Sequence, residues 1–150
     1  MPSPLSKKPL WAGRIMSAVA ALFLLFDATI KLMVIPPVVE SFTRLGFPVH
    51  LSRGIGTLEL VCLIVYVIPR TAIPGAILLT GFLGGAVVTH VRVGDPLLSH
   101  ALFPVYIGAL LWGGLLLRGR LAALVAELTG SPSARPVPRG SLTPTVIHRV

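Results

Sequence analysis

Four long apolar blocks constrain this 150-residue chain more than any other feature of its sequence. The blocks cover residues 15–34, 55–68, 72–91 and 101–117. A helix that crosses the hydrocarbon core of a bilayer needs about 20 residues, within a range of about 17–25. The second block reaches this length only if residues 51–54 join its helix. Because unpaired backbone groups cannot face lipid, each block is expected to be helical. The pattern predicts an all-α membrane protein, a four-transmembrane-helix bundle.

The composition excludes the main soluble classes. Hydrophobic residues make up 54% of the chain and charged residues 12%, with a mean hydropathy of +0.88. Soluble domains carry about 25% charged residues. Disorder, in contrast, requires high charge and low hydrophobicity. Neither a soluble globular enzyme nor a disordered chain fits these values, so the lipid bilayer is the expected environment.

The net charge of +8 reflects basic residues placed as membrane-topology signals rather than as a nucleic-acid-binding surface. Nine of the 13 basic residues lie near the termini or in the short connection after the second block: Lys7, Lys8, Arg14, Arg70, Arg118, Arg120, Arg135, Arg139 and Arg149. They bracket apolar blocks instead of forming a basic patch with aromatic neighbours, so no nucleic-acid partner is expected. Four spans place both termini on one side. The positive-inside rule makes that side cytoplasmic.

Three regions follow from these blocks. Residues 1–13 are expected to be a basic cytoplasmic N-terminus, residues 14–128 the four-helix transmembrane domain, and residues 129–150 a disordered Pro/Ser/Arg-rich cytoplasmic tail. Apolar residues at helical spacing in 37–46 and 118–128 predict short interfacial helices on the outer and inner surfaces. Residues 69–71 are expected to form a tight turn that makes a hairpin of the second and third spans.

Several kinds of chemistry find no support in the sequence. The single cysteine, Cys62, excludes an intrachain disulfide, a dithiol redox pair and a cysteine-based metal site. The histidines do not show a spacing typical of metal ligands. Nucleophile-elbow and phosphate-loop motifs do not occur in the sequence.

Five ionisable residues within the predicted spans are the candidate site: Asp27, Lys31, Glu59, His90 and Arg92. Each would cost several kcal/mol if it were left unpaired in hydrocarbon. Counted at about 1.5 Å per residue, all five fall in the outer half of the bilayer, on three helices. The two carboxylates balance Lys31 and Arg92. We therefore expect one polar cluster that faces the bundle interior and binds a ligand.

Structural explanations stand beside this hypothesis. Asp27 and Lys31 are four residues apart and can neutralise each other on one helix face. His90 and Arg92 can end their helix and reach the interface. The Gly81-x₃-Gly85 pair is typical of close helix packing, or else leaves a cavity next to Glu59. Pro104 is expected to kink the fourth span.

Several motifs resemble the DoxX-like family over about residues 11–121. They are Phe26-Asp27-x₃-Lys31-Leu32, Leu58-Glu59-Leu60-x-Cys62, Ile68-Pro69-Arg70-Thr71, Thr80-Gly81-x₂-Gly84-Gly85-Ala86-Val87-x-Thr89-His90-Val91-Arg92 and His100-x-Leu102-Phe103-Pro104-Val105-Tyr106. The resemblance implies a small bacterial four-helix protein of the cytoplasmic (inner) membrane. It also suggests a quinone as ligand, because the family name derives from a subunit associated with quinone-linked sulfur oxidation. It supplies no settled catalytic residues.

The leading hypothesis is a membrane protein that is non-catalytic on its own, or an accessory subunit, and binds a small amphipathic ligand such as a quinone. His90 and Glu59 would hydrogen-bond the ligand, Asp27 and Lys31 would set their charge, and Arg92 would supply a fixed positive potential. One alternative is a proton-passing subunit of a quinone-linked oxidoreductase. Another is a structural or chaperone-like component with self-paired charges. The expected protein partner is a membrane redox protein or a second copy of the chain.

Overall fold

A computed structural model describes residues 7–119, which contain helices and no strand. The elements are α1 (Lys7–Met33), α2 (Pro36–Arg44), α3 (Leu51–Val67), α4 (Ala72–Arg92), a π-helix η1 (Leu97–Ala101) and α5 (Phe103–Leu117). The all-α prediction is confirmed. Five α-helices are present in this part of the chain, so the simple count of four is not reproduced.

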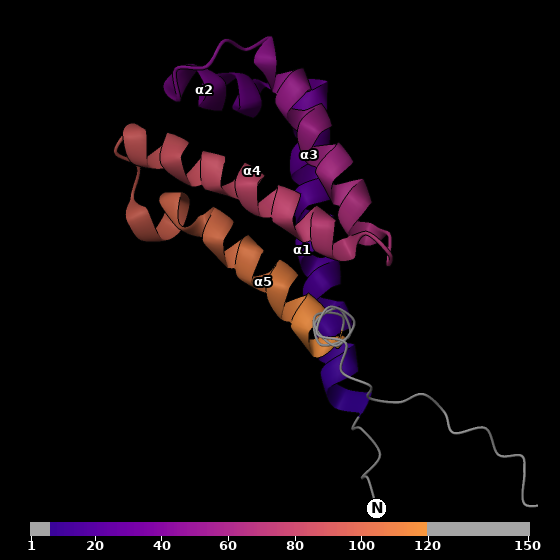
Figure 1. The fold of residues 1–150 in the computed structure, drawn as a ribbon. Helices are drawn as coiled ribbons and strands as arrows, with labels where there is room; N and C mark the ends of the chain where they lie inside the picture. The colour runs from indigo at the N-terminus through magenta and orange to yellow at the C-terminus, as the bar shows by residue number, and fades with distance from the viewer. Residues whose placement is uncertain (1–6, 120–150) are drawn as a thin grey trace, which may run out of the picture.

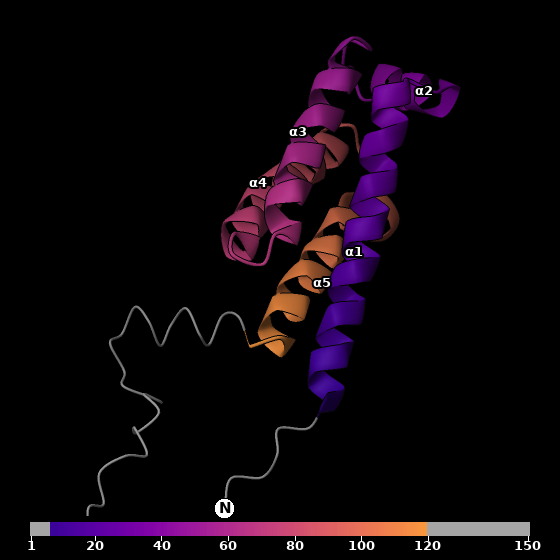
Figure 2. The ribbon, with the colours of Figure 1, turned by 90° about the vertical axis from the view of Figure 1, so that its right-hand side faces the viewer.

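The four longer α-helices form a ring in which each packs against two neighbours. Helix α1 contacts α3 and α5, and α4 contacts α3 and α5 (Figure 1). Helix α2 lies across the end of the bundle where α1 ends and α3 begins, and both views show it there (Figures 1 and 2). It is the short amphipathic helix that the sequence predicts, and Val38 and Phe42 are its buried residues.

Three segments are long and apolar enough to cross a membrane: Lys8–Met33, Ala72–Arg92 and Leu97–Leu117. Helix α3 has 17 residues, about 26 Å, and begins at Leu51 as the second apolar block requires. Large apolar side chains cover the outside of the bundle; Leu22, Phe26 and Val88 are each more than 60% exposed. An outer surface of this kind is expected of a protein whose solvent is lipid.

Some boundaries differ from those expected. Helix α1 begins at Lys7, inside the segment assigned to the N-terminus. The prediction that Pro104 kinks its helix is wrong. This proline lies in the first turn of α5, where a backbone N–H would have no hydrogen-bond acceptor within the helix. Residues 68–71 form the predicted turn between α3 and α4. Residues 120–150, with most of the predicted inner-surface helix and the whole tail, lie outside the described residues.

The bundle interior is packed with leucine and alanine, and a polar contact joins three of its helices at one end. Leu24, Leu79, Leu111 and Leu115 are almost fully buried. The Tyr66 hydroxyl lies 2.8 Å from Ser17 Oγ and 3.1 Å from the Leu111 carbonyl oxygen. This contact joins α3 to α1 and α5 at the end of the bundle opposite α2, where α1 begins and α5 ends.

Helices α3 and α4 lie in close backbone contact at Gly75. A Cβ atom at this position would lie 2.3 Å from the Tyr66 backbone nitrogen. Only glycine permits that separation, because the obstacle is backbone rather than a flexible side chain. The contact fixes the two helices just beyond the tight turn that connects them.

Candidate functional site

Lys31 joins two helices through two carboxylates. Its ammonium nitrogen lies 2.5 Å from Asp27 Oδ2, one turn earlier on α1, and 2.8 Å from Glu59 Oε2 on α3. The Asp27 contact is the i, i+4 pair that the sequence predicts. The Glu59 contact is an interhelical one, so the charges on α1 are not simply self-paired. Three of the five predicted site residues therefore meet at one point.

The backbone geometry around Lys31 lets α3 come close enough for this contact. Ser52 Oγ donates a hydrogen bond of 2.8 Å to the Lys31 carbonyl oxygen, and Ser52 is fully buried. One turn later, a Cβ atom at Gly56 would lie 2.9 Å from Lys31 Cβ. The side chain of Lys31 is thereby held against α3, one turn before Glu59.

Glu59 is enclosed more completely than its partners. Its side chain has no exposed surface, whereas those of Lys31 and Asp27 are 17% and 30% exposed. One of its oxygens, Oε1, has no hydrogen-bond partner. Cys62 and Tyr66 continue the same buried face of α3, as the helical spacing predicts.

His90 binds a carboxylate outside the predicted cluster. Its Nδ1 lies 2.5 Å from Asp95 Oδ2, and Arg44 at the end of α2 donates a hydrogen bond to Asp95 Oδ1. These contacts tie α2 to the segment that follows α4. The hydrogen bond with His90, followed by those with Arg44, lowers the pKa of Asp95 below its ordinary value of 3.8.

Arg92 does not balance the intramembrane carboxylates. Its guanidinium donates a hydrogen bond to the Leu45 carbonyl oxygen and lies 6.0 Å from the centre of the Phe47 ring. The single five-residue cluster is thus divided: Asp27, Lys31 and Glu59 form one group, and His90 belongs to a second with Asp95. Arg92 fastens the segment after α2 to α4.

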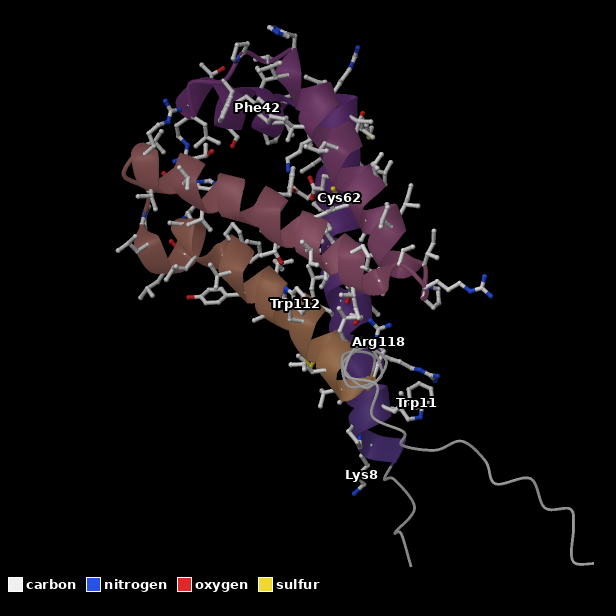
Figure 3. The ribbon with its side chains drawn as sticks, in the orientation of Figure 1. Lys8, Trp11, Phe42, Cys62, Trp112 and Arg118 are labelled. Atoms are coloured by element: carbon white, nitrogen blue, oxygen red, sulfur yellow. The ribbon has the colours of Figure 1, made fainter. Side chains whose placement is uncertain are left out.

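A cavity of about 530 Å³ lies between the two groups. Its lining comes from α1, α2, α3, α4, η1 and α5, and is mainly apolar. Phe42, labelled on α2 in Figure 3, belongs to this lining together with Phe23, Phe82 and Phe103. Polar groups enter at separate points of the wall; they are Asp27, Lys31, Ser41, Thr89, His90 and His100. Volumes of about 300–1,000 Å³ with such linings are typical of small-molecule sites.

The α4 glycines form part of this wall. Cβ atoms added at Gly81 and Gly85 would meet no atom within 4 Å, so neither glycine mediates close packing among the described helices. Both line the 530 Å³ cavity. Of the two explanations offered for Gly81 and Gly85, these observations favour a cavity over close helix packing. Asp27 and Lys31 line the cavity, whereas Glu59 does not and contacts it only through Lys31.

Asp95 and Arg44 are site residues that the sequence hypothesis missed. Asp95 lies between Gly94 and Pro96 and has the local context of an ordinary surface turn. Arg44 ends an amphipathic helix, where a basic side chain is common for local reasons alone. Asp95 reaches His90 through the local turn that ends α4, whereas only the folded arrangement of α2 over α4 brings Arg44 to Asp95.

Metal binding finds no donor set in the residues that the structure describes. Among residues 7–119, no three His, Cys, Asp or Glu side chains are grouped as metal ligands. His90 and His100 lie with their rings 6.4 Å apart at the cavity wall. Their available chemistry is hydrogen bonding rather than coordination by a complete ligand set.

Comparison with known proteins gives one match. No curated protein and no solved structure matches the chain. The sequence model of the DoxX-like family matches residues 15–114, two thirds of the chain, a range that includes all five predicted site residues and nearly all of the helical bundle. Its apolar helices make the chain an integral membrane protein. By this match, the chain belongs to the DoxX-like family.

Proposed function

We propose that this protein binds one small amphipathic molecule, with a quinone as the best candidate, in the cavity beside Lys31 and His90. The observation that carries the proposal is an apolar cavity of about 530 Å³ whose polar groups stand at separate points of its wall. A ligand with an apolar body and one or two oxygen atoms matches that distribution. The ring and two carbonyl oxygens of a quinone satisfy it.

Lys31 and His90 supply the hydrogen bonds in this proposal. Both line the cavity, and both are fixed in place by carboxylates: Lys31 by Asp27 and Glu59, His90 by Asp95. A donor held in position loses little rotational freedom when a ligand binds. Glu59 acts through Lys31 rather than by touching the ligand. Arg92 holds the end of α2 over the cavity through the Leu45 carbonyl oxygen and does not contact the ligand.

The membrane arrangement is part of the same proposal. Helix α3 is a span in addition to the three long apolar segments, short but adequate if the bilayer thins or if Arg53 reaches the interface. Both termini are cytoplasmic, and the α2 end of the bundle faces outward. The membrane is the bacterial cytoplasmic membrane, and the protein acts with a redox partner or as several copies. The basic residues near the termini and Arg70 support this orientation.

The test is mass spectrometry of small molecules that co-purify with the detergent-solubilised protein. Wild type is compared with G81L, which places a side chain in the cavity, and with G54L as the matched control. Both glycines have open space around them, but only Gly81 lines the cavity. We expect one quinone or one lipid species in wild type and G54L, and its loss in G81L.

Thermal melts accompany these measurements so that only folded variants are compared. A mixture of bulk lipids in all three samples would contradict ligand binding. It would favour the structural role, in which Lys31 serves to hold α1 against α3. A ligand that is retained in G81L but lost in H90A would place the site elsewhere around His90.

A proton-passing subunit of a quinone-linked oxidoreductase is the second candidate. The observation in its favour is the buried Glu59, which stands behind two ionisable residues of the cavity wall. It predicts that the bound quinone is reduced only when a membrane partner with a redox cofactor is added. If the protein binds the quinone but no partner reduces it, the proton-passing role is contradicted and the ligand-binding role is retained.

A further inference from the structure

Glu59 carries the one unpartnered buried polar atom among the side chains of residues 7–119. Its Oε1 is enclosed and has no hydrogen-bond partner, while its Oε2 lies 2.8 Å from Lys31 Nζ. The side chain as a whole has no exposed surface. A fully buried carboxylate with one free oxygen is a costly arrangement, since its charge is not fully compensated.

The charge around Glu59 does not balance. Lys31 is shared between Glu59 and Asp27, so two carboxylates face one ammonium group. In the described part of the chain, neither carboxylate forms an ion pair with another cation. Arg44 and His90 are paired with Asp95 instead. If all three groups were ionised, the interior would carry one net negative charge.

The remaining neighbours cannot remove that charge. On α3, the titratable group nearest along the same face is the Cys62 thiol, which is buried and has no positive form. Helix α4 contributes the apolar Phe82 ring, 5.4 Å from Lys31 Nζ, while its basic residues His90 and Arg92 bind Asp95 and the Leu45 carbonyl oxygen instead. The one titratable side chain of α5 is Tyr106, which is exposed.

We propose that Glu59 is a proton-binding site, a carboxylic acid at neutral pH beside an ionised Asp27–Lys31 pair. Of the two carboxylates, Glu59 takes the proton because it is the fully buried one, whereas Asp27 reaches the cavity. Burial disfavours the charged form, and two acids that share one base do not both ionise. The added proton makes the three groups neutral overall. Solvent protons reach Glu59 through the Asp27–Lys31 pair at the cavity wall.

Infrared spectroscopy of the purified full chain at neutral pH tests this site, since a protonated carboxyl group has its own C=O stretching band. Wild type is compared with E59Q, D27N and E40Q; Glu40 is an exposed residue of α2 and serves as the control. We expect the band in wild type and E40Q, and its loss in E59Q. The band should weaken in D27N, because Glu59 then no longer shares Lys31 with a second carboxylate. Raising the pH should remove the wild-type band as Glu59 ionises.

Two outcomes would overturn the proposal. A band lost in D27N and kept in E59Q assigns the proton to Asp27. No carboxyl band in wild type at neutral pH shows that both acids are ionised. If E59Q does not fold, the E40Q/E127Q variant is used, in which Glu59 is the one remaining glutamate of the chain. Labelling this variant with ¹³C-glutamate should shift the carboxyl band if the band belongs to Glu59. A band that fails to shift contradicts the assignment to Glu59.

Discussion

Lys31 is the residue on which the electrostatics of the bundle interior depend most directly. Its ammonium group contacts carboxylates of α1 and α3 at 2.5 and 2.8 Å. Removing one partner from a buried ion pair costs more than removing the whole pair, because a charge remains without compensation. Without Lys31, Asp27 loses the compensation of its charge and Glu59 loses its hydrogen-bond donor.

The K31M substitution is expected to lower the free energy of unfolding by about 3 kcal/mol. This figure is at the low end of the range for buried pairs because Asp27 is partly exposed to the cavity. The measurement is thermal or denaturant unfolding of the purified protein in detergent.

The D27N/K31M double variant is the control for the charge effect. It removes the acid that K31M leaves unpaired, so we expect it to recover most of the lost stability. A double variant as unstable as K31M would show that the packing of Lys31 against α3, rather than its charge, stabilises the bundle.

At the scale of elements, α2 is held across the cavity by polar contacts at its end. Arg44 pairs with Asp95, and Arg92 binds the Leu45 carbonyl oxygen. Phe42 on the buried face of α2 lines the cavity. Loosening these contacts should therefore expose the cavity before it unfolds the bundle.

The Asp95 contacts have a defined pH dependence. Because its pKa is lowered from 3.8 in the folded protein, the ionised carboxylate contributes stability above about pH 3.8. This contribution is lost as the pH falls through the lowered pKa. We expect the difference in Tm between wild type and D95N to be constant near neutral pH and to shrink in strong acid.

Amide hydrogen exchange gives the matching measurement on α2. At neutral pH, the amides of residues 38–44 should exchange faster in D95N than in wild type, while α4 stays protected. Equal protection of α2 in both proteins would show that its buried apolar face holds it without Asp95.

The α4 glycines predict opposite effects of the same substitution. An added Cβ at Gly75 would meet the Tyr66 backbone at 2.3 Å, whereas at Gly81 it would meet nothing within 4 Å. We expect G75A to destabilise the protein by about 1–3 kcal/mol, the usual cost of overpacking. G81A should be neutral or stabilising by up to about 1 kcal/mol, because alanine favours helix. Parallel unfolding curves would decide, and equal losses in both would contradict the packing difference.

At the scale of the whole molecule, the number of spans depends on α3. If its 17 residues cross the membrane, Arg53 and Arg70 lie on opposite sides. In the proposed orientation, Arg70 and Lys8 are cytoplasmic and Arg53 lies outside. All three residues are exposed. The chain has one cysteine, so a C62A background allows single cysteines to be introduced at these positions.

An impermeant maleimide applied to intact cells should label R53C, and should label K8C and R70C only after the cells are opened. Labelling of both R53C and R70C from outside would show that α3 does not span, because these residues lie at its two ends. Labelling of K8C alone from outside would reverse the position of the N-terminus.

Much of the fold could be predicted from the sequence because the apolar blocks and their spacing are local features. The block lengths predict the long helices, and the period of Val38 and Phe42 predicts α2. The exact start of each helix was less predictable. A kink at Pro104 is expected when the helix extends on both sides of this proline, whereas α5 begins at Phe103, one residue before it.

For the site, the sequence by itself determined that Asp27 and Lys31 pair, because residues four apart on one helix must be neighbours. It also determined the membrane character, since apolar length and composition belong to the chain alone. The His90–Asp95 contact is also local, since five residues separate the two, whereas only packing brings Lys31 to Glu59 and Arg92 to the Leu45 carbonyl oxygen. The last two contacts depend on how helices distant in sequence turn and approach one another, a consequence of packing that no local pattern specifies.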